Sequence, residues 1–212
     1  MSLSTLWRAP LDSLRLKFAR ARYDFKASPA SIERFSFHEL DRLVIAKPDG
    51  KLGDLQVLTL LVTALRRQCP DLRIAVICTR AHVPLYKERL QLHELYPLPP
   101  KPHARVLKAC LHEVLGDGPC DLLLMTEDLS KPRDLLISST LHPPRFAGFD
   151  LNLRCINLNL TARNHGKSIR AYFSDLLSAG GLDAAAMSYL PLYTKEELTA
   201  MRKLLGQGCV GL

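Results

Sequence analysis

The sequence lacks the features that mark several common classes of protein. Its longest apolar run, residues 55–65, contains polar residues and is too short to span a bilayer. The first residues hold no apolar stretch with a small-residue cleavage site, so we expect a cytoplasmic protein rather than an exported one. Aromatic residues make up only 7% of the chain and do not alternate with basic ones, so a stacking platform for nucleic-acid bases is missing.

Metal-binding patterns are missing as well. The six cysteines form no C-x-x-C pair and have no histidine at zinc spacing. The chain has no D-x-D motif and no histidine cluster, so neither a metal nor another cofactor is expected. Because most of the cysteines lie in apolar runs, we expect them to be reduced residues of the protein core.

The remaining composition is that of a globular protein with a basic surface. Hydrophobic residues make up 47% and charged residues 24% of the 212 residues, which is enough chain to bury a core of ordinary size. The formal net charge of +8 indicates an anionic partner. Nucleic acid, an anionic membrane surface and a phosphorylated substrate are the three candidates.

The most informative stretch is residues 43–69. An aliphatic run at 43–46 is followed by a polar segment at 47–54 and then by apolar residues at helical spacing. A buried strand, a turn and a helix in this order predict the first βα unit of an α/β fold, a Rossmann-like parallel sheet flanked by helices. The turn lies at the carboxyl end of its strand, where ligands bind in open α/β sheets.

Two glycines make this turn a candidate ligand-binding site. Gly50 and Gly53 allow a ligand to approach the backbone, and the start of the following helix adds unpaired N–H groups. The two glycines are only three residues apart, so the turn fits neither the G-x-G-x-x-G pattern nor the P-loop pattern. A Walker ATPase and an ordinary dehydrogenase are therefore disfavoured.

Further strands and helices alternate along the chain, which supports a parallel sheet. The predicted strands are 73–79, 94–97 and 121–126; the predicted helices are 103–115, 133–141, 169–177 and 195–205, and residues 80–90 are predicted to be a loop.

Several of these segments together resemble glycosyltransferase family 9, the heptosyltransferases of lipopolysaccharide core assembly. The resemblance rests on three segments: KPDGKLGD at 47–54, RFAGFD at 145–150, and residues 164–167, which lead into the helix at 169–177. One departure is the segment TEDL at 126–129, where the family usually has D-x-Q-G.

The resemblance implies the N-terminal half of a GT-B enzyme. Residues 39–190 would form a Rossmann-like acceptor-side domain, and 191–212 a linker helix with the start of a second domain. The chain would then be either a piece of a longer enzyme or a shortened gene product. The implied activity is inverting transfer of a sugar, heptose from ADP-heptose, to the lipopolysaccharide inner core. A nucleotide sugar and the core acceptor are the implied partners.

The resemblance also assigns roles to individual residues. Asp54 matches the catalytic carboxylate, which takes the proton from the acceptor hydroxyl. The residues expected to bind the acceptor are Lys47, Lys51, Gly53, Arg80, His165 and Arg170. Simpler interpretations stay open, because Asp54 is also a favoured helix N-cap and lysines at a turn are usually solvated. Asp49, in the same turn, is the next candidate for the base.

Residues 1–38 form a basic extension ahead of the first predicted strand. Its apolar residues fall near one face of a helix, although Pro10 is expected to interrupt that helix. One interpretation is an interfacial helix that makes the protein peripheral on the inner membrane, which is anionic. The other is an extension packed on the domain with a solvated basic face.

Two further functions compete with glycosyl transfer. The first is a non-catalytic basic Rossmann-like module that binds an anionic partner such as nucleic acid, which the charge favours and the missing aromatic platform opposes. The second is a degenerate domain that keeps the fold and acts only in assembly.

Overall fold

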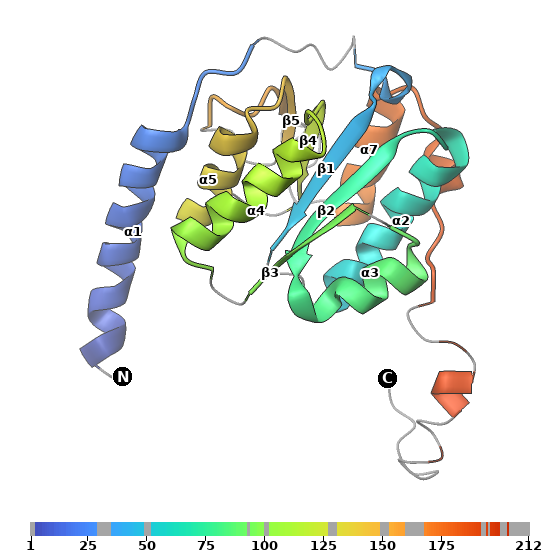
Figure 1. Ribbon diagram of the computed structural model, residues 1–212, viewed down its shortest axis with the longest axis horizontal. Helices are drawn as coiled ribbons and strands as arrows, with labels where there is room; N and C mark the ends of the chain where they lie inside the picture. The colour runs from blue at the N-terminus through green and yellow to red at the C-terminus, as the bar shows by residue number, and fades with distance from the viewer. Residues whose placement is uncertain are drawn as a thin grey trace.

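Among the residues that the structure describes, six parallel strands form one sheet with helices on both faces (Figure 1). The structure is a computed structural model. It describes residues 3–28, 35–48, 52–92, 94–99, 102–126, 131–148, 153–159, 168–191, 194, 196–199 and 203, with the backbone alone for 3–12, 52 and 54.

The strand order is β3-β2-β1-β4-β5-β6. The strands are β1 (Arg42–Lys47), β2 (Arg73–Thr79), β3 (Glu94–Leu98), β4 (Leu122–Met125), β5 (Arg145–Gly148) and β6 (Leu158–Asn159). The α-helices are α1 (Leu3–Tyr23), α2 (Leu52–Gln68), α3 (Val83–Arg89), α4 (Ala104–Gly116), α5 (Pro132–Leu141) and α7 (Ile169–Ala179). Short 3-10 helices are η2 (Phe37–Glu39), η3 (Arg80–His82) and η4 (Ala184–Ala186).

The sheet separates two apolar layers. Successive side chains of a strand point to opposite faces, so Leu43 and Ile45 of β1 pack with α2 and α7. Val44 and Ala46 pack on the other face with α4 and α5. All six residues of β1 are buried, as expected for a central strand of a parallel sheet that is covered on both faces.

The predicted α/β class is confirmed, and most elements match their predicted ranges. The four predicted strands correspond to β1–β4 and agree at their ends to about one residue. The helices predicted at 103–115, 133–141 and 169–177 are α4, α5 and α7. Residues 196–199 and 203 are helical, and the rest of the helix predicted at 195–205 lies outside the described residues. No strand was predicted at 145–148, where β5 lies.

Two local predictions are wrong. Residues 80–90 are not a loop, because η3 and α3 occupy 80–89. The proline at the second position of α3 suits the first turn of a helix, where its missing N–H costs nothing. Pro10 does not interrupt α1, which runs from Leu3 to Tyr23. α1 packs against α5, and tertiary packing of this kind supplies most of a helix's stability, which can outweigh the cost of an interior proline.

A buried arginine joins three elements at the amino edge of the sheet. Arg42 is only 1% exposed, and its Nε donates to Glu94 Oε2 of β3 at 2.8 Å. Its two terminal nitrogens donate to the carbonyl oxygens of Val114 and Gly118, each at 2.6 Å, and to the hydroxyl of Tyr96 at 2.7 Å. A buried charge is tolerated only when it is paired and hydrogen-bonded in this way.

The network continues from Arg42 to the surface. Tyr96 donates its hydroxyl hydrogen to Asp117 Oδ2 at 2.6 Å. Burial and this hydrogen bond raise the pKa of Tyr96 well above its usual value, so the phenol stays protonated and remains a donor. Arg73 of β2 donates to Glu94 at 2.7 Å and to the carbonyl of Asp117 at 3.0 Å. These hydrogen bonds and ion pairs therefore connect β1, β2, β3 and the end of α4 at the amino edge of the sheet.

The described cysteines are free and buried, which confirms the expected core role for them. They are Cys69, Cys78, Cys110, Cys120 and Cys155. Burial raises the pKa of Cys78, Cys120 and Cys155 to about 12 and that of Cys110 to about 11. Thiols in this state are protonated at neutral pH and are poor nucleophiles. Cys209 lies outside the described residues.

We expect the change Tyr96→Phe to destabilise the fold by about 1–3 kcal/mol, because it leaves a buried N–H of Arg42 without its acceptor. Urea unfolding followed by circular dichroism measures this change. The control is Tyr189→Phe, at a side chain that is 49% exposed, where we expect a change within about 0.5 kcal/mol. Equal stability of the two variants would show that the hydroxyl of Tyr96 does not contribute to the stability of the Arg42 network.

Candidate functional site

The carboxyl edge of the sheet has a topological switch point between β1 and β4. These strands are neighbours, but the chain leaves β1 into α2 on one face and leaves β4 into α5 on the other. The helices diverge at this point, and open α/β sheets bind ligands in the crevice that results. β1 ends at Lys47 and α2 begins at Leu52, so the connection between them starts at the carboxyl end of the strand, as predicted, and leaves the sheet at this switch point. Residues 49–51 of the predicted turn lie outside the described residues.

Two helices begin at this edge, side by side on the same face (Figure 1). α2 ends near η2, where Cys69 Sγ lies 3.7 Å from His38 Nδ1. α7 ends there too, because the carbonyl of Gly180 accepts the N–H of Phe37 at 3.0 Å. A Cβ on Gly180 would lie 2.3 Å from the Phe37 ring, so this close approach requires glycine.

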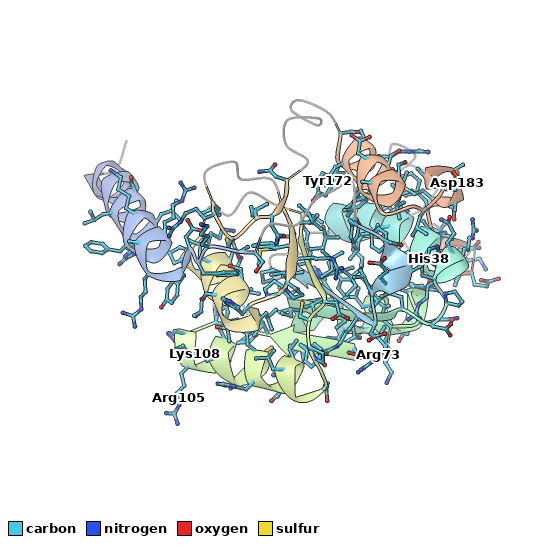
Figure 2. The ribbon with its side chains drawn as sticks, turned by 90° about the horizontal axis from the view of Figure 1, so that it is seen from above. His38, Arg73, Arg105, Lys108, Tyr172 and Asp183 are labelled. Atoms are coloured by element: carbon cyan, nitrogen blue, oxygen red, sulfur yellow. The ribbon has the colours of Figure 1, made fainter. Side chains whose placement is uncertain are left out.

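Since both helices end at the amino edge, both begin at the carboxyl edge. Tyr172, near the start of α7, is buried in the layer that α7 shares with α2 (Figure 2). The partial positive charges of the two N-termini therefore act in the same direction. Ser168 caps α7 by accepting the N–H of Ala171 at 3.3 Å, and the first turn of α7 holds no acidic residue.

Asp54 and Gly53 lie in the first turn of α2, which begins at Leu52. Asp54 is inside the helix rather than ahead of it, so its position does not match an N-cap. A carboxylate in the first turn of a helix interacts favourably with the helix dipole. Gly53 is exposed, and an added Cβ would meet nothing within 4 Å. Packing therefore gives no reason for glycine at this position.

Three of the expected cations lie at this edge. Lys47, the last residue of β1, is only 4% exposed, so the alternative of a solvated lysine is wrong. Arg80 follows the carboxyl end of β2, whose Cys78 pairs with Lys47 across the two strands. Arg170 is the second residue of α7. Both arginines are exposed and available to an anionic ligand.

The remaining predicted residues lie outside the described part of the chain. They are Lys51, His165, Asp49 and Gly50, together with most of the departing segment at 126–129. Their roles stay predictions. Among the described residues, no three His, Cys, Asp or Glu side chains lie close enough together to hold a metal ion.

Sequence reasoning missed a polar contact and a polar track near the site. The contact joins Thr79 Oγ1 and His82 Nδ1 at 3.0 Å, directly after β2. The track is a row of side chains on α2, which binds the backbone of residues 183–190. At the end of α2, Gln68 Oε1 accepts the N–H of Asp183, which Figure 2 labels, at 2.7 Å.

Further along α2 the track continues toward the first turns of the helix. Thr63 Oγ1 donates to the carbonyl of Ser188 at 2.9 Å. Thr59 accepts the N–H of Leu190 at 3.2 Å, and Gln56 donates to its carbonyl at 3.0 Å. The chain therefore passes Leu190 close to the start of α2. Polar residues at 56, 59 and 63 in the otherwise apolar run 55–65 were the available signal.

Comparison with known proteins gives a fold likeness. No protein-family model and no curated protein matches the sequence. Among solved structures, a glycosyl transferase family 9 protein from Veillonella parvula is similar, with a TM-score of 0.56 and 15% identity over 87% of this chain and 53% of that chain. E. coli heptosyltransferase WaaC, solved with ADP-2-deoxy-2-fluoro heptose, has a TM-score of 0.48 and 15% identity over 78% of this chain and 54% of that chain.

The first of these matches shows that the chain shares its fold with a glycosyl transferase of family 9. The chain spans about half the length of the two solved proteins. At this level of identity the comparison establishes the architecture, and the chemistry has to be argued from the site.

We expect Gly53→Ala to raise the free energy of unfolding by about 0.4–1 kcal/mol, because alanine restricts the unfolded chain and fits the open first turn. If a ligand approaches the backbone here, the same variant should lose activity while it gains stability. Thermal unfolding and turnover, measured on the same preparations, show whether the two properties separate.

The matched control is Gly116→Ala at the end of α4, where an added Cβ also meets nothing within 4 Å. Gly116 lies at the amino edge, near the Arg42 network. The Gly116→Ala variant should gain stability to a similar degree with no loss of activity. A loss of stability in Gly53→Ala alone would point to a packing role for this glycine.

Proposed function

We propose that this chain is the acceptor-side part of an inverting glycosyltransferase. The observation that carries the proposal is the position of Asp54, in the first turn of α2 at the switch point of a fold shared with a family 9 glycosyl transferase. A carboxylate at this point can face an acceptor hydroxyl held above the carboxyl edge.

In the proposed reaction, the acceptor oxygen attacks the anomeric carbon of a nucleotide sugar. Asp54 takes the hydroxyl proton as the new carbon–oxygen bond forms. The bond between that carbon and the phosphate oxygen breaks on the opposite side, which inverts the anomeric configuration. The leaving nucleoside diphosphate keeps the bonding electron pair. Its negative charge has to be stabilised by protein dipoles and cations, because the proposal includes no metal.

The charges at the carboxyl edge suit an anionic acceptor. The N-termini of α2 and α7 start side by side there, and Lys47, Arg80 and Arg170 come from three different elements around them. Guanidinium groups bind phosphate and carboxylate with paired hydrogen bonds. Lys51 and His165 complete the proposed acceptor set, with Gly53 allowing close approach.

The finer identity of the substrates rests on the sequence motifs at 47–54, 145–150 and 164–167. They support heptose as the sugar, ADP-heptose as the donor and the lipopolysaccharide inner core as the acceptor. The donor site would lie on a second lobe beyond Leu190, in the part of the enzyme that this chain does not span. The track on α2 supports this arrangement, since it brings the chain at Leu190 to the start of α2.

The test of the proposed base is Asp54→Asn in the full-length protein, with ADP-heptose and a heptose-deficient core acceptor. Turnover should fall by about 10²–10⁴, the usual range for removing a general base. The KM for the acceptor should change far less, because the lost interaction acts mainly in the transition state. The matched control is Asp71→Asn, at an exposed carboxylate on the amino side of β2. Parent-level transfer by Asp54→Asn would reject Asp54 as the base.

The double variant Arg80→Gln/Arg170→Gln tests whether these arginines bind the acceptor. Its KM for the phosphorylated acceptor should rise by about tenfold or more, because each charged hydrogen bond is worth roughly 1.5–3 kcal/mol. The control is Arg105→Gln/Lys108→Gln on α4, which removes the same charge from the other face of the sheet; Figure 2 shows Arg105 pointing away from the sheet. An equal rise in both double variants would mean that only the overall charge matters.

A further inference from the structure

Helix α1 has one face that packs on the domain. Ala19 is 6% exposed and belongs to the apolar layer under α4 and α5, and Leu16 and Tyr23 pack against the same layer. Just beyond the helix, Asp24 accepts the N–H groups of Arg154 and Cys155 at 2.9 and 3.1 Å. The second half of α1 is therefore fixed to the domain, beside α5 (Figure 1).

The other face of α1 carries apolar side chains that nothing in the described chain covers. Leu14 is 52% exposed and Phe18 is 68% exposed. They are four residues apart, so they lie within about 40° of each other around the helix. In sequence a spacing of three or four residues continues back to Leu11 and Trp7, whose side chains lie outside the described residues. We call Leu14 and Phe18 the exposed stripe.

Basic residues flank the exposed stripe on both sides. Arg15 and Arg22 fall on one side of it and Lys17 on the other, at the helical rotation of about 100° per residue. All three are exposed, and the sequence from 13 to 23 contains no acidic residue. An apolar stripe between basic flanks matches a helix that lies in the interface of an anionic bilayer.

We propose that α1 is a membrane-docking helix, which inserts the exposed stripe into the interface of an anionic lipid surface while its other face stays packed on α5. The two interpretations of the basic extension are then both correct, each for one face of the helix. The charge pattern favours lipid over a second copy of this chain, because two such stripes in contact would bring like charges together.

The arrangement leaves the candidate site accessible. α1 packs on the layer of α4 and α5, whereas α2 and α7, which begin at the site, lie on the opposite face of the sheet (Figure 1). A bilayer under α1 therefore does not cover α2 or α7. Within the described residues no helix combines the length and apolar character needed to cross a bilayer. The proposed contact is an interfacial one.

The test is binding of the protein to sedimentable vesicles that contain phosphatidylglycerol and phosphatidylcholine in about equal amounts. The test variant is Leu14→Gln/Phe18→Gln, and its bound fraction at fixed lipid should correspond to an affinity at least about tenfold lower. The matched control is Val106→Gln/Tyr189→Gln, which removes two exposed apolar side chains from other elements, 43% and 49% exposed. It should bind like the parent protein.

Two further arms identify the partner. Parent binding should weaken on pure phosphatidylcholine and in high salt, since the surface attraction is screened beyond roughly 10 Å at 0.1 M salt. Circular dichroism and thermal unfolding should be the same for all variants, because the changed residues are exposed. Equal vesicle binding by the test variant and the parent would overturn the proposal. So would a dimer of the parent protein that only Leu14→Gln/Phe18→Gln abolishes, because the stripe would then bind a second copy.

Discussion

The sheet depends most on the hydrogen bonds and the ion pair that the buried guanidinium of Arg42 makes. This guanidinium is almost completely buried at the start of the central strand, and its partners come from β3, from the end of α4 and from the turn after it. Removing the charged partner of a buried ion pair, here Glu94, costs roughly 3–5 kcal/mol, and losing a neutral partner costs less, so each contact constrains the others. The network sets the positions of β1 and β3 at the amino edge and thereby determines where β1 ends at the other edge.

The two edges of the sheet consequently differ in role: the amino edge stabilises the fold, and the carboxyl edge holds the candidate site. The amino edge is closed by the Arg42 network on one side and, on the other, by Phe35 and Phe37 against Gly180. The carboxyl edge gathers two helix N-termini and cations from β1, η3 and α7. The contacts that close the amino edge are therefore separated from the candidate site by the length of the strands.

The sequence predicted what depends on local pattern and missed what depends on distant partners. The aliphatic run of β1 and the helical spacing in α2 are local signals, and both elements were found. Helix α3 was missed because its seven residues carry little periodicity. Arg42 resembles an ordinary flank of a strand, because its partners lie 52 to 76 residues away. The burial of Lys47 was missed for the same reason, since β2, which pairs with it, and β4, which pairs with most of β1, come later in the chain.

The track on α2 joins the fold to the proposed function. One face of α2 packs in the core, and another binds the backbone of residues 183–190 through Gln56, Thr59, Thr63 and Gln68. Arg67 is a fifth such side chain, which donates to the carbonyl of Ala186 at 3.1 Å, and together these side chains hold the chain until it passes the first turns of α2. Any lobe that follows Leu190 then starts from a point fixed relative to Asp54. Because the rate of a group transfer depends steeply on how the two reactants are placed, this track would limit their relative motion to what the chain beyond Leu190 permits.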